Sequence, residues 1–485
     1  MSHEIHAEYG RSFLFPPCLE DWVPADHPAR FIREFVEALD LTELGFAEHT
    51  SEEGRPAYAN ELLLKVWLYG YMGRIRATRQ LEKACKEHLS LLWLTGLKAP
   101  DHNTLWRFWR ENRKALREVF RAGVKVAAAQ GLIGMICHAV DGTKIRAVAS
   151  RRTMEHEKEL EKVLARVEAE LGEMEAEIEA AELAPGGDYR LPAGLHEAEK
   201  LKAKILESLA QMRQAERGHL HPQEREARLM LCEGRKEPAY NAQAVADGQA
   251  GIIVAAEVVN AETDHALLVP MLDEVQKNLG AVAEETVADG QYGTVGELTE
   301  AEVRGYEVLV APGSEQGGVK RGAYDAANFG YDSEQDEVIC PQGVRLKFQG
   351  MRKKSGARVA VRSYRCQAYA TCPVRRLCSQ GRKGRRIEIS PQRAARERQR
   401  RKRSHPAARQ LLRQRKAIIE PVFARIKQAM GFRRWTVRGL DNVRTQWALL
   451  CAACNLKKMY QHWRTRKFVW ARPSALGAVV CPECS

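Results

Sequence analysis

The sequence predicts an α/β fold in which a mixed sheet follows a helical N-terminal domain and carries two inserts. Short apolar strands alternate with amphipathic helices between residues 240 and 312, as in α/β proteins. The first 130 residues read as mostly helical, and a heptad pattern separates the first predicted strand from the others. We therefore expect a helical domain over residues 1–130, an α/β domain over 131–460 with inserts at 154–232 and 313–395, and a tail over 461–485.

The N-terminal domain is expected to contain three helices. Apolar residues recur at helical spacing in residues 60–69, and a second helix fits residues 79–88. A third helix fits residues 105–119, and Asp101, Asn103 or Thr104 can cap it. On this third helix we expect three aromatic side chains to pack inward: Trp106, Phe108 and Trp109. A basic stripe of four arginines suits docking on DNA, although a solvated helix face explains it equally well: Arg107, Arg110, Arg113 and Arg117.

The α/β domain is expected to begin with an apolar strand over residues 135–140. This strand runs into Asp141, and Gly142 is expected to end it because glycine disfavours strand interiors. The later elements follow in the order strand 240–245, strand 251–259, helix 266–279, strand 285–288, helix 297–304 and strand 306–311. Asp289 comes directly after the strand 285–288.

The first insert reads as an antiparallel helical hairpin. Its first arm has apolar residues at heptad spacing: Leu160, Leu164, Val167, Leu171, Met174 and Ile178. Pro185-Gly186-Gly187 breaks the pattern, and a second arm follows with Leu201, Ile205, Leu209 and Met212. The first arm is acidic, with eleven Glu against three Lys or Arg in residues 155–182, so we expect it to point away from any anionic partner. A contact between two copies of the chain is the alternative to an intramolecular hairpin.

The charge balance indicates an anionic partner. The chain has 485 residues with 76 Lys and Arg against 63 Asp and Glu, a net charge of +13 and a pI near 9.2. Nucleic acid is the first partner to consider, and unused surface charge is the alternative. Residues 382–416 hold fifteen Lys or Arg against two Glu, which favours DNA contact over a disordered charged linker.

The chain is expected to be an intracellular protein with no membrane partner. No stretch reaches 18 apolar residues, and the first 22 residues lack the pattern of a secretory signal. In that compartment the twelve cysteines are expected to be reduced thiols or metal ligands rather than disulfides.

Three acidic residues form a candidate catalytic group: Asp141, Asp289 and Glu420. Two lie at predicted strand ends, where α/β folds place their sites, and the third lies on a late predicted helix that could pack across them. Three close carboxylates repel one another unless cations separate them, so the group predicts two bound Mg²⁺ or Mn²⁺ ions. Such ions can activate a hydroxyl and stabilise the leaving oxygen at a phosphodiester. The alternative is that aspartate before glycine simply suits turns.

At these residues the sequence resembles the DDE transposases of bacterial insertion sequences. The resemblance rests on five segments in order: Ala139–Lys144, Tyr240–Val245, Val287–Tyr292, Ile419–Phe423 with Ile426 and Lys427, and Gly431–Arg434 with Arg438 and Gly439. Residues 54–65 and 79–82 are similar to the helical N-terminal domain of these enzymes. The resemblance covers roughly residues 10–460 and implies a ribonuclease H-like catalytic fold over 131–460, with DNA binding by the N-terminal domain.

The resemblance also implies a role for each matching residue. Asp141 would bridge both metal ions, and Asp289 and Glu420 would each hold one, for cleavage at the element ends followed by strand transfer. Lys427, two helical turns after Glu420, would contact a phosphate. Arg413 and Lys416 stand where the family has Tyr and Arg. Four further cations are candidates for contact with the DNA backbone: Lys144, Arg146, Arg433 and Arg434.

The second insert holds four cysteines within 39 residues: Cys340, Cys366, Cys372 and Cys378. They could form a structural zinc site in a segment too small to fold alone, but the spacing lacks a tight knuckle, so free reduced thiols are the alternative. Cys451 and Cys454 could form a second set with Cys481 and Cys484, but the first two lie in an apolar helix and are expected in the core.

The leading hypothesis is therefore an insertion-sequence transposase of the bacterial cytoplasm and nucleoid. Its expected partners are double-stranded DNA, as inverted-repeat ends and target, and other copies of itself, because joining two ends requires at least a dimer. The first alternative is a transposase-derived DNA-binding repressor without catalysis. The second is a structure-specific nuclease, which the helical N-terminal domain and the large inserts fit less well.

Overall fold

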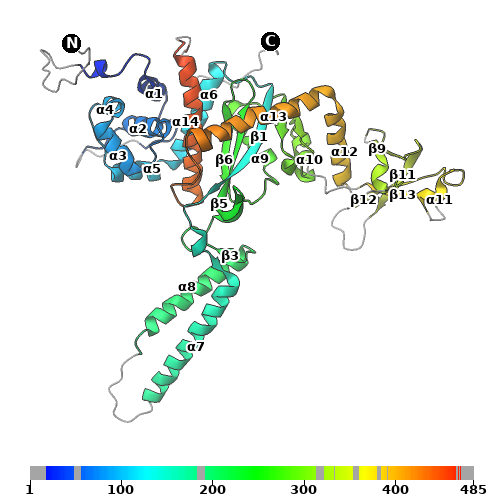
Figure 1. Cartoon of the computed structure of the whole chain (residues 1–485), viewed down its shortest axis with the longest axis horizontal. Coiled ribbons are helices and arrows are strands. Elements are labelled where there is room, and N and C mark those ends of the chain that lie inside the picture. Colours follow the sequence, from blue (N-terminus) through cyan, green and yellow to red (C-terminus); the bar gives the residue numbers. More distant parts are fainter. Residues whose placement is uncertain are drawn as a thin grey trace, which may run out of the picture.

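The computed structural model describes residues 18–47, 56–182, 192–312, 322–332, 334–352, 360–379, 384–389, 391–465, 468 and 470. A body of helices and one mixed sheet carries a long helical hairpin, and a second small sheet lies beyond one end of the body (Figure 1). The predicted α/β class with a mixed sheet is confirmed.

The main sheet has the strand order β4-β5-β1-β7-β8, with β6 also paired to β5. Its strands are β1 (Cys137–Arg146), β4 (Arg228–Cys232), β5 (Arg235–Asp247), β6 (Ile253–Val259), β7 (Glu285–Ala288) and β8 (Val308–Val310). β1 is antiparallel to β5 and parallel to β7, and β7 is parallel to β8. This order is consistent with the ribonuclease H-like fold that the resemblance implies. The helices α9 (Leu268–Leu279) and α10 (Val295–Val303) follow β6 and β7 in the chain.

Gly142 does not end β1, contrary to the sequence prediction. The strand continues to Arg146, and Gly142 pairs with Gln243 of β5. A Cβ atom built on Gly142 would lie 3.0 Å from an Asp264 oxygen and closer still to the Gln243 amide. The glycine therefore marks a close approach of neighbouring side chains rather than a strand terminus. Asp141 consequently lies within β1, not at its end.

Helices and a short 3-10 turn form the N-terminal part: η1 (Leu19–Trp22), α1 (Pro28–Glu37), α2 (Asn60–Met72), α3 (Thr78–Glu87), α4 (Leu89–Leu94), α5 (His102–Glu111) and α6 (Arg113–Ala129). Of the three candidate caps, Asp101 is the one that caps α5, through the N–H groups of Asn103 and Thr104. The single helix expected over residues 105–119 is wrong, because the chain leaves helical geometry at Asn112, whose amide bonds to the Phe108 carbonyl.

The inward packing of Trp106 is also wrong. Trp106 is 40% exposed, whereas Phe108 and Trp109 are buried. Leu105, Phe108 and Trp109 are three or four residues apart and share one helix face, which leaves Trp106 on the neighbouring face. Two of the four arginines of the basic stripe are neutralised within the chain, since Arg113 and Arg117 form ion pairs with Asp441.

Helix α14 (Leu440–Trp463) joins the N-terminal helices to the sheet. It packs against α6 and α2 on one side and β6 on another, and one continuous core includes all of them. The Trp447 indole N–H donates to the Gln243 carbonyl at 2.9 Å, and Tyr460 Oη donates to the Asp26 carbonyl at 2.8 Å. Cys451 and Cys454 are buried in this core, as predicted, whereas Cys481 and Cys484 lie outside the described residues.

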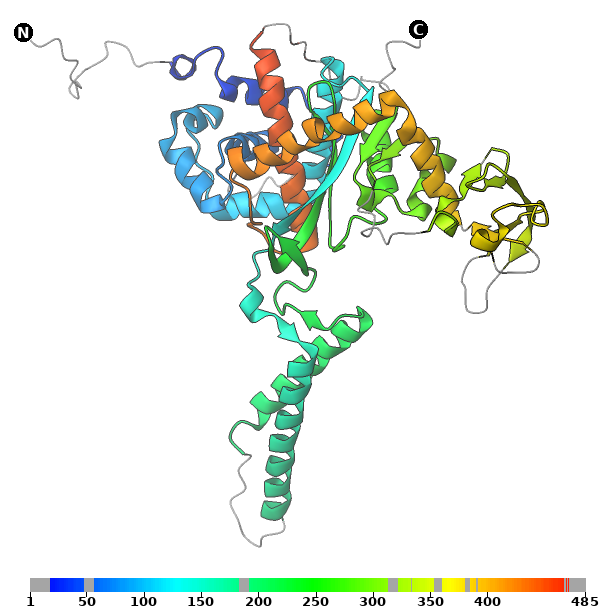
Figure 2. The same cartoon turned by 45° about the vertical axis from the view of Figure 1, so that its right-hand side comes forward.

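The helical hairpin leaves the body after β1 and returns before β4 (Figure 2). It consists of η2 (Arg151–Thr153), β2 (Glu155–His156), α7 (Glu157–Glu182), α8 (Leu195–Gln214) and β3 (His219–Leu220). Val167 and Leu171 of the predicted seam are buried against α8. Leu201 is 44% exposed, so the second arm joins the seam only from Ile205 onward. The predicted break at residues 185–187 lies outside the described residues.

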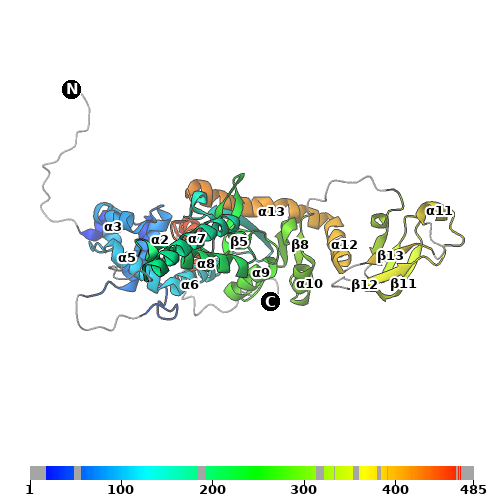
Figure 3. The ribbon, with the colours of Figure 1, turned by 90° about the horizontal axis from the view of Figure 1, so that it is seen from below.

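A second sheet with the order β13-β12-β11-β10-β9 lies beyond helix α12 (Figure 3). Its elements are η4 (Ala326–Asn328), β9 (Gly330–Asp332), β10 (Glu337–Ile339), β11 (Arg345–Arg352), β12 (Val361–Arg365), α11 (Arg375–Cys378) and β13 (Arg386–Ile389). It has a hydrophobic core of its own, separate from the main one.

The basic run of residues 382–416 continues from β13 into helices rather than forming a linker. It contains α12 (Pro391–Ser404) and most of α13 (Pro406–Ala424), which ends in the π-helical turn η5 (Arg425–Ala429). Several of its cations are already used within the chain, since Arg398 pairs with Glu302 and Lys402 pairs with Glu307.

Among the helices that the structure describes, none combines the length and apolar composition that a membrane crossing needs.

We expect Trp447→Ala to lower the free energy of unfolding by about 3–5 kcal/mol, because it removes a fully buried ring and its hydrogen bond. Chemical denaturation followed by circular dichroism measures this loss. Trp106→Ala, which truncates the same residue type on an exposed helix face, should cost less than about 1 kcal/mol. Equal losses in the two variants would contradict the conclusion that α14 joins the N-terminal helices to the sheet through buried side chains.

Candidate active site

The parallel pairing of β1 with β7 brings two of the predicted acids together. Val140 is the partner of Ala288, and Asp141 and Asp289 are the next residues on the two strands. Neighbouring strands lie about 4.8 Å apart, so Asp141 and Asp289 lie side by side where β7 ends. Asp141 is 27% exposed and Asp289 is 43% exposed, which leaves both accessible from solvent.

Arg415 of α13 lies between these two aspartates. One guanidinium nitrogen is 3.2 Å from Asp141 Oδ2, and the other is 3.6 Å from Asp289 Oδ1. Burial raises the pKa of Asp141, and the charges of Asp289 and Asp264 act in the same direction, whereas the Gly142 N–H and Arg415 oppose the rise. The guanidinium therefore supplies the positive charge that two adjacent carboxylates require.

A second polar cluster centres on Asp264, which precedes α9. Its Oδ1 accepts hydrogen bonds from Lys144 Nζ at 2.7 Å, Asn241 Nδ2 at 2.7 Å and Gln243 Nε2 at 2.9 Å. The hydroxyl of Tyr292, in η3 (Gly290–Tyr292) just after Asp289, donates to the Gln243 amide oxygen. These hydrogen bonds connect β1, β5 and the segment after β7 next to the two aspartates.

Glu420 lies on α13 but is not assembled with the two aspartates. Its side chain is 63% exposed, and its ion pair is with Lys416 at 3.9 Å, one helical turn earlier. Among the described residues, no group of three or more Asp, Glu, His or Cys side chains is arranged to hold a metal ion. The helix is irregular directly after Glu420, because Pro421 lies inside it and η5 follows. Such irregularities weaken the backbone hydrogen bonding of a helix and are frequent at functional sites.

The seven cations expected to contact DNA have three kinds of environment. Some are paired with carboxylates: Lys144 with Asp264, Lys416 with Glu420, and Arg433 with Glu233. Arg434 donates to the backbone carbonyls of Ala147 and Val148. The other three have no ion pair within the described part of the chain: Arg146, Arg413 and Lys427.

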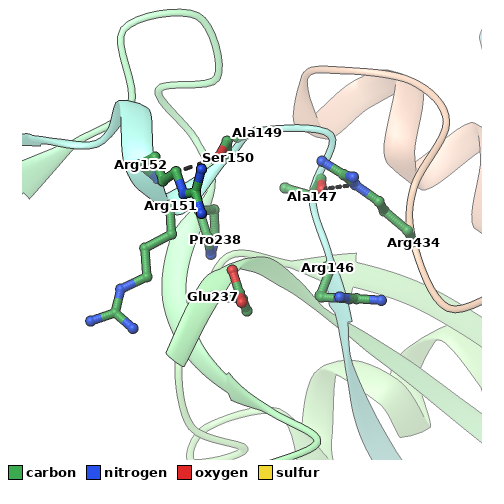
Figure 4. A pocket seen from close by; sticks show the side chains of 9 residues that line it. All are labelled: Arg146, Ala147, Ala149, Ser150, Arg151, Arg152, Glu237, Pro238 and Arg434. Carbon is green, nitrogen blue, oxygen red and sulfur yellow. Dashed lines mark hydrogen bonds between the residues drawn. The ribbon is translucent and has the colours of Figure 1, made fainter. Parts of the chain in front are cut away.

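A basic pocket of about 450 Å³ opens where β1 leaves the sheet toward the hairpin (Figure 4). Four arginines and one glutamate line it, a net charge of +3: Arg146, Arg151, Arg152, Arg434 and Glu237. Figure 4 shows Arg434 approaching Ala147 from a separate chain segment. No ion pair within the described residues neutralises any of the four guanidinium groups. The pocket therefore has the positive charge to attract an anion such as a phosphate.

Sequence reasoning missed Arg415 and Asp264. Arg415 is one of fifteen basic residues in a run, and only its burial, with 11% of the side chain exposed, distinguishes it. A buried charge in an amphipathic helix could be suspected from its place among Ile419 and Val422 on one face. Asp264 stands in a loop with no motif, and no sequence signal indicates it.

We expect Arg415→Met to lower the free energy of unfolding by about 1–3 kcal/mol at neutral pH, because two carboxylates lose their shared cation. Without the guanidinium the pKa of Asp141 rises further, so the loss should shrink at about pH 5, where that carboxyl becomes more protonated. Denaturation at both pH values measures this. Arg413→Met, on the same helix but exposed, should change little; a loss independent of pH would contradict the charge argument.

Comparisons with known protein families find transposase domains in two parts of the chain. The family model described as "Transposase DDE domain" matches residues 339–460, and the model described as "Transposase domain (DUF772)" matches residues 17–111. The first match includes Glu420, whereas Asp141 and Asp289 lie between the two matched segments. No curated protein and no solved structure matches the chain significantly. The two segments that match transposase domains flank the α/β sheet in the chain, and together they support an insertion-sequence DDE transposase.

Proposed function

We propose that this transposase binds the terminal inverted repeats of its element and catalyses metal-dependent strand cleavage and strand transfer. The observation that carries the proposal is the register of β1 and β7, which places Asp141 beside Asp289. A single cation, Arg415, joins the two carboxylates. Adjacent carboxylates with a shared cation are an unfavourable arrangement for stability alone, so their presence in a transposase supports a catalytic role.

The donor set fits Mg²⁺ or Mn²⁺. Both ions prefer carboxylate oxygens, and Asp141 and Asp289 offer accessible oxygens at one sheet edge. In this proposal Asp141, Asp289 and Glu420 would hold the ions. Bound there, the ions would supply a Lewis acid and an activated hydroxyl for attack on phosphorus.

Arg415 and Glu420, both on α13, have different roles in this proposal. Arg415 contacts both aspartates, and with metal ions bound there its guanidinium would be available to a DNA phosphate. Glu420 reaches the aspartates only if α13 shifts or turns, and the irregular backbone after Glu420 makes this segment the part of α13 most suited to such a change. Lys144, which pairs with Asp264, is proposed to contact the substrate backbone.

The basic pocket at the root of the hairpin is proposed to hold the DNA backbone. Four arginines and one glutamate line this pocket, so its net positive charge attracts phosphate groups. Double-stranded DNA is therefore the proposed partner, as inverted-repeat ends and as target, with at least two copies of the chain joining two ends.

One observation favours the alternative of a non-catalytic DNA-binding repressor. Glu420 pairs with Lys416 and not with the aspartates, so the acidic trio is not assembled in this structure. A repressor would use the same basic surfaces without cleaving DNA. The cleavage experiment distinguishes the two functions.

We expect the purified protein to cut DNA that carries the element's ends in Mg²⁺ or Mn²⁺, and not in EDTA. Asp141→Ala, Asp289→Ala and Glu420→Ala should each reduce cutting by at least about a hundredfold while end binding persists. Gel analysis of labelled ends measures cutting, and a mobility shift measures binding. Glu300→Ala, which removes an exposed acid of α10, is the control and should keep full activity.

Two outcomes would overturn the proposal. Binding of the ends without cutting in either metal would favour the repressor. Cutting that survives the loss of Asp141 or Asp289 would place the active site elsewhere.

We expect Arg146→Gln, Arg151→Gln and Arg152→Gln each to weaken DNA binding, because each removes a cation from the basic pocket. The slope of log affinity against log salt concentration should become shallower by about 0.9 for each phosphate that the variant no longer neutralises. Fluorescence anisotropy at several salt concentrations measures the slope. Arg304→Gln makes the same charge change at a guanidinium that already pairs with Asp273, so an equal effect there would indicate a nonspecific charge effect.

A further inference from the structure

We propose that Cys340, Cys366, Cys372 and Cys378 bind one structural Zn²⁺ at the edge of the second sheet. The four residues come from three separate places in the sequence of elements: the end of β10, the end of β12, and the segment around α11. All four line a single cavity of about 260 Å³. None of them forms a disulfide. Four thiols around one cavity match the ligand number and type of structural zinc sites.

The backbone beside one of these cysteines donates a hydrogen bond to its sulfur. The Val344 N–H donates to Cys340 Sγ at 3.3 Å, in a turn that Gly343 closes with a φ of 77°. Hydrogen bonds from outer groups orient metal ligands, so this donor fixes the orientation of the Cys340 sulfur.

Arg385 gives a further indication of negative charge in the cavity. It lines the cavity beside the cysteines, and one of its terminal nitrogens donates to the Cys378 carbonyl at 3.3 Å. Its Nε is buried and has no hydrogen-bond partner among the described residues. A thiolate is an acceptor for such a donor, and four thiolates around one Zn²⁺ carry a net charge of −2 that a guanidinium offsets.

The second sheet also needs a stabilising link. Its core contains seven buried side chains, with Cys340, Cys366 and Cys378 packed at the margin: Phe329, Tyr331, Val338, Leu346, Tyr364, Ile387 and Ile389. A core of this size supplies little net stability, and small domains commonly add a metal or disulfides. One ion bound by the cysteines beside β10, β12 and α11 would link these three elements at the margin of the core.

The four thiols do not converge on one point in this structure. Within the described residues, no three of them lie close enough together to bind one metal ion. Binding therefore requires the cysteine side chains to rotate about their Cα–Cβ bonds toward the cavity centre. Each thiol releases its proton to solvent as its sulfur binds, giving Zn–S bonds of about 2.3 Å.

Metal analysis of the full-length protein tests this proposal. Protein purified without chelators should contain about one zinc per chain by mass spectrometry. Cys372→Ser and Cys378→Ser should lose it, whereas Cys18→Ser, at an exposed cysteine outside the cavity, should retain it. Asp141→Ala should also retain it, which separates this site from the proposed catalytic ions. Cobalt replacement should give thiolate charge-transfer absorption in the wild type and in Cys18→Ser, and not in the two cavity variants.

The zinc content of the wild type keeps the test independent of whether the serine variants fold. Protein that contains no zinc and binds neither added Zn²⁺ nor Co²⁺ would overturn the proposal. Zinc that remains in Cys372→Ser and Cys378→Ser but is lost in Asp141→Ala would also overturn it, because the ion would then belong to the acidic site.

Discussion

The parallel hydrogen bonding of β1 with β7 is the constraint on which the site depends. These strands are separated by the hairpin, β5, β6 and α9 in the chain, yet their register is set residue by residue, from Cys137 opposite Glu285 to Val140 opposite Ala288. A shift of one residue would turn one aspartate to the other face of the sheet. The pairing therefore determines both that the two carboxylates meet and that they face α13.

Two carboxylates that meet at a sheet edge create an electrostatic requirement that the surrounding elements satisfy. α13 contributes Arg415 to Asp141 and Asp289, and β1 contributes Lys144 to Asp264. Glu420 and Lys416 form a separate pair on the exposed side of the same helix. The protein thus balances these acidic groups with its own cations.

The long segments between the strands leave the body away from this edge. The hairpin with its acidic first arm begins after Arg146, and the basic pocket lies at its root. The segment that connects β1 to β4 therefore carries a positive surface near the sheet and a negative surface on the hairpin. The second sheet lies beyond α12 with a core of its own. Helix α14 closes the body on the opposite side and buries Trp447 against β5. Each long segment therefore adds a surface without interrupting the register of β1 and β7.

The sequence by itself determined the elements with strong local signals and the resemblance to transposases. Strand 285–288, the cap at Asp101 and the buried positions of Cys451 and Cys454 follow from periodicity and side-chain chemistry over a few residues. Only the tertiary structure decided that β1 passes through Gly142, that Arg415 joins the aspartates and that Glu420 stands apart. These outcomes depend on contacts between residues more than a hundred positions apart, whose energies no local pattern encodes.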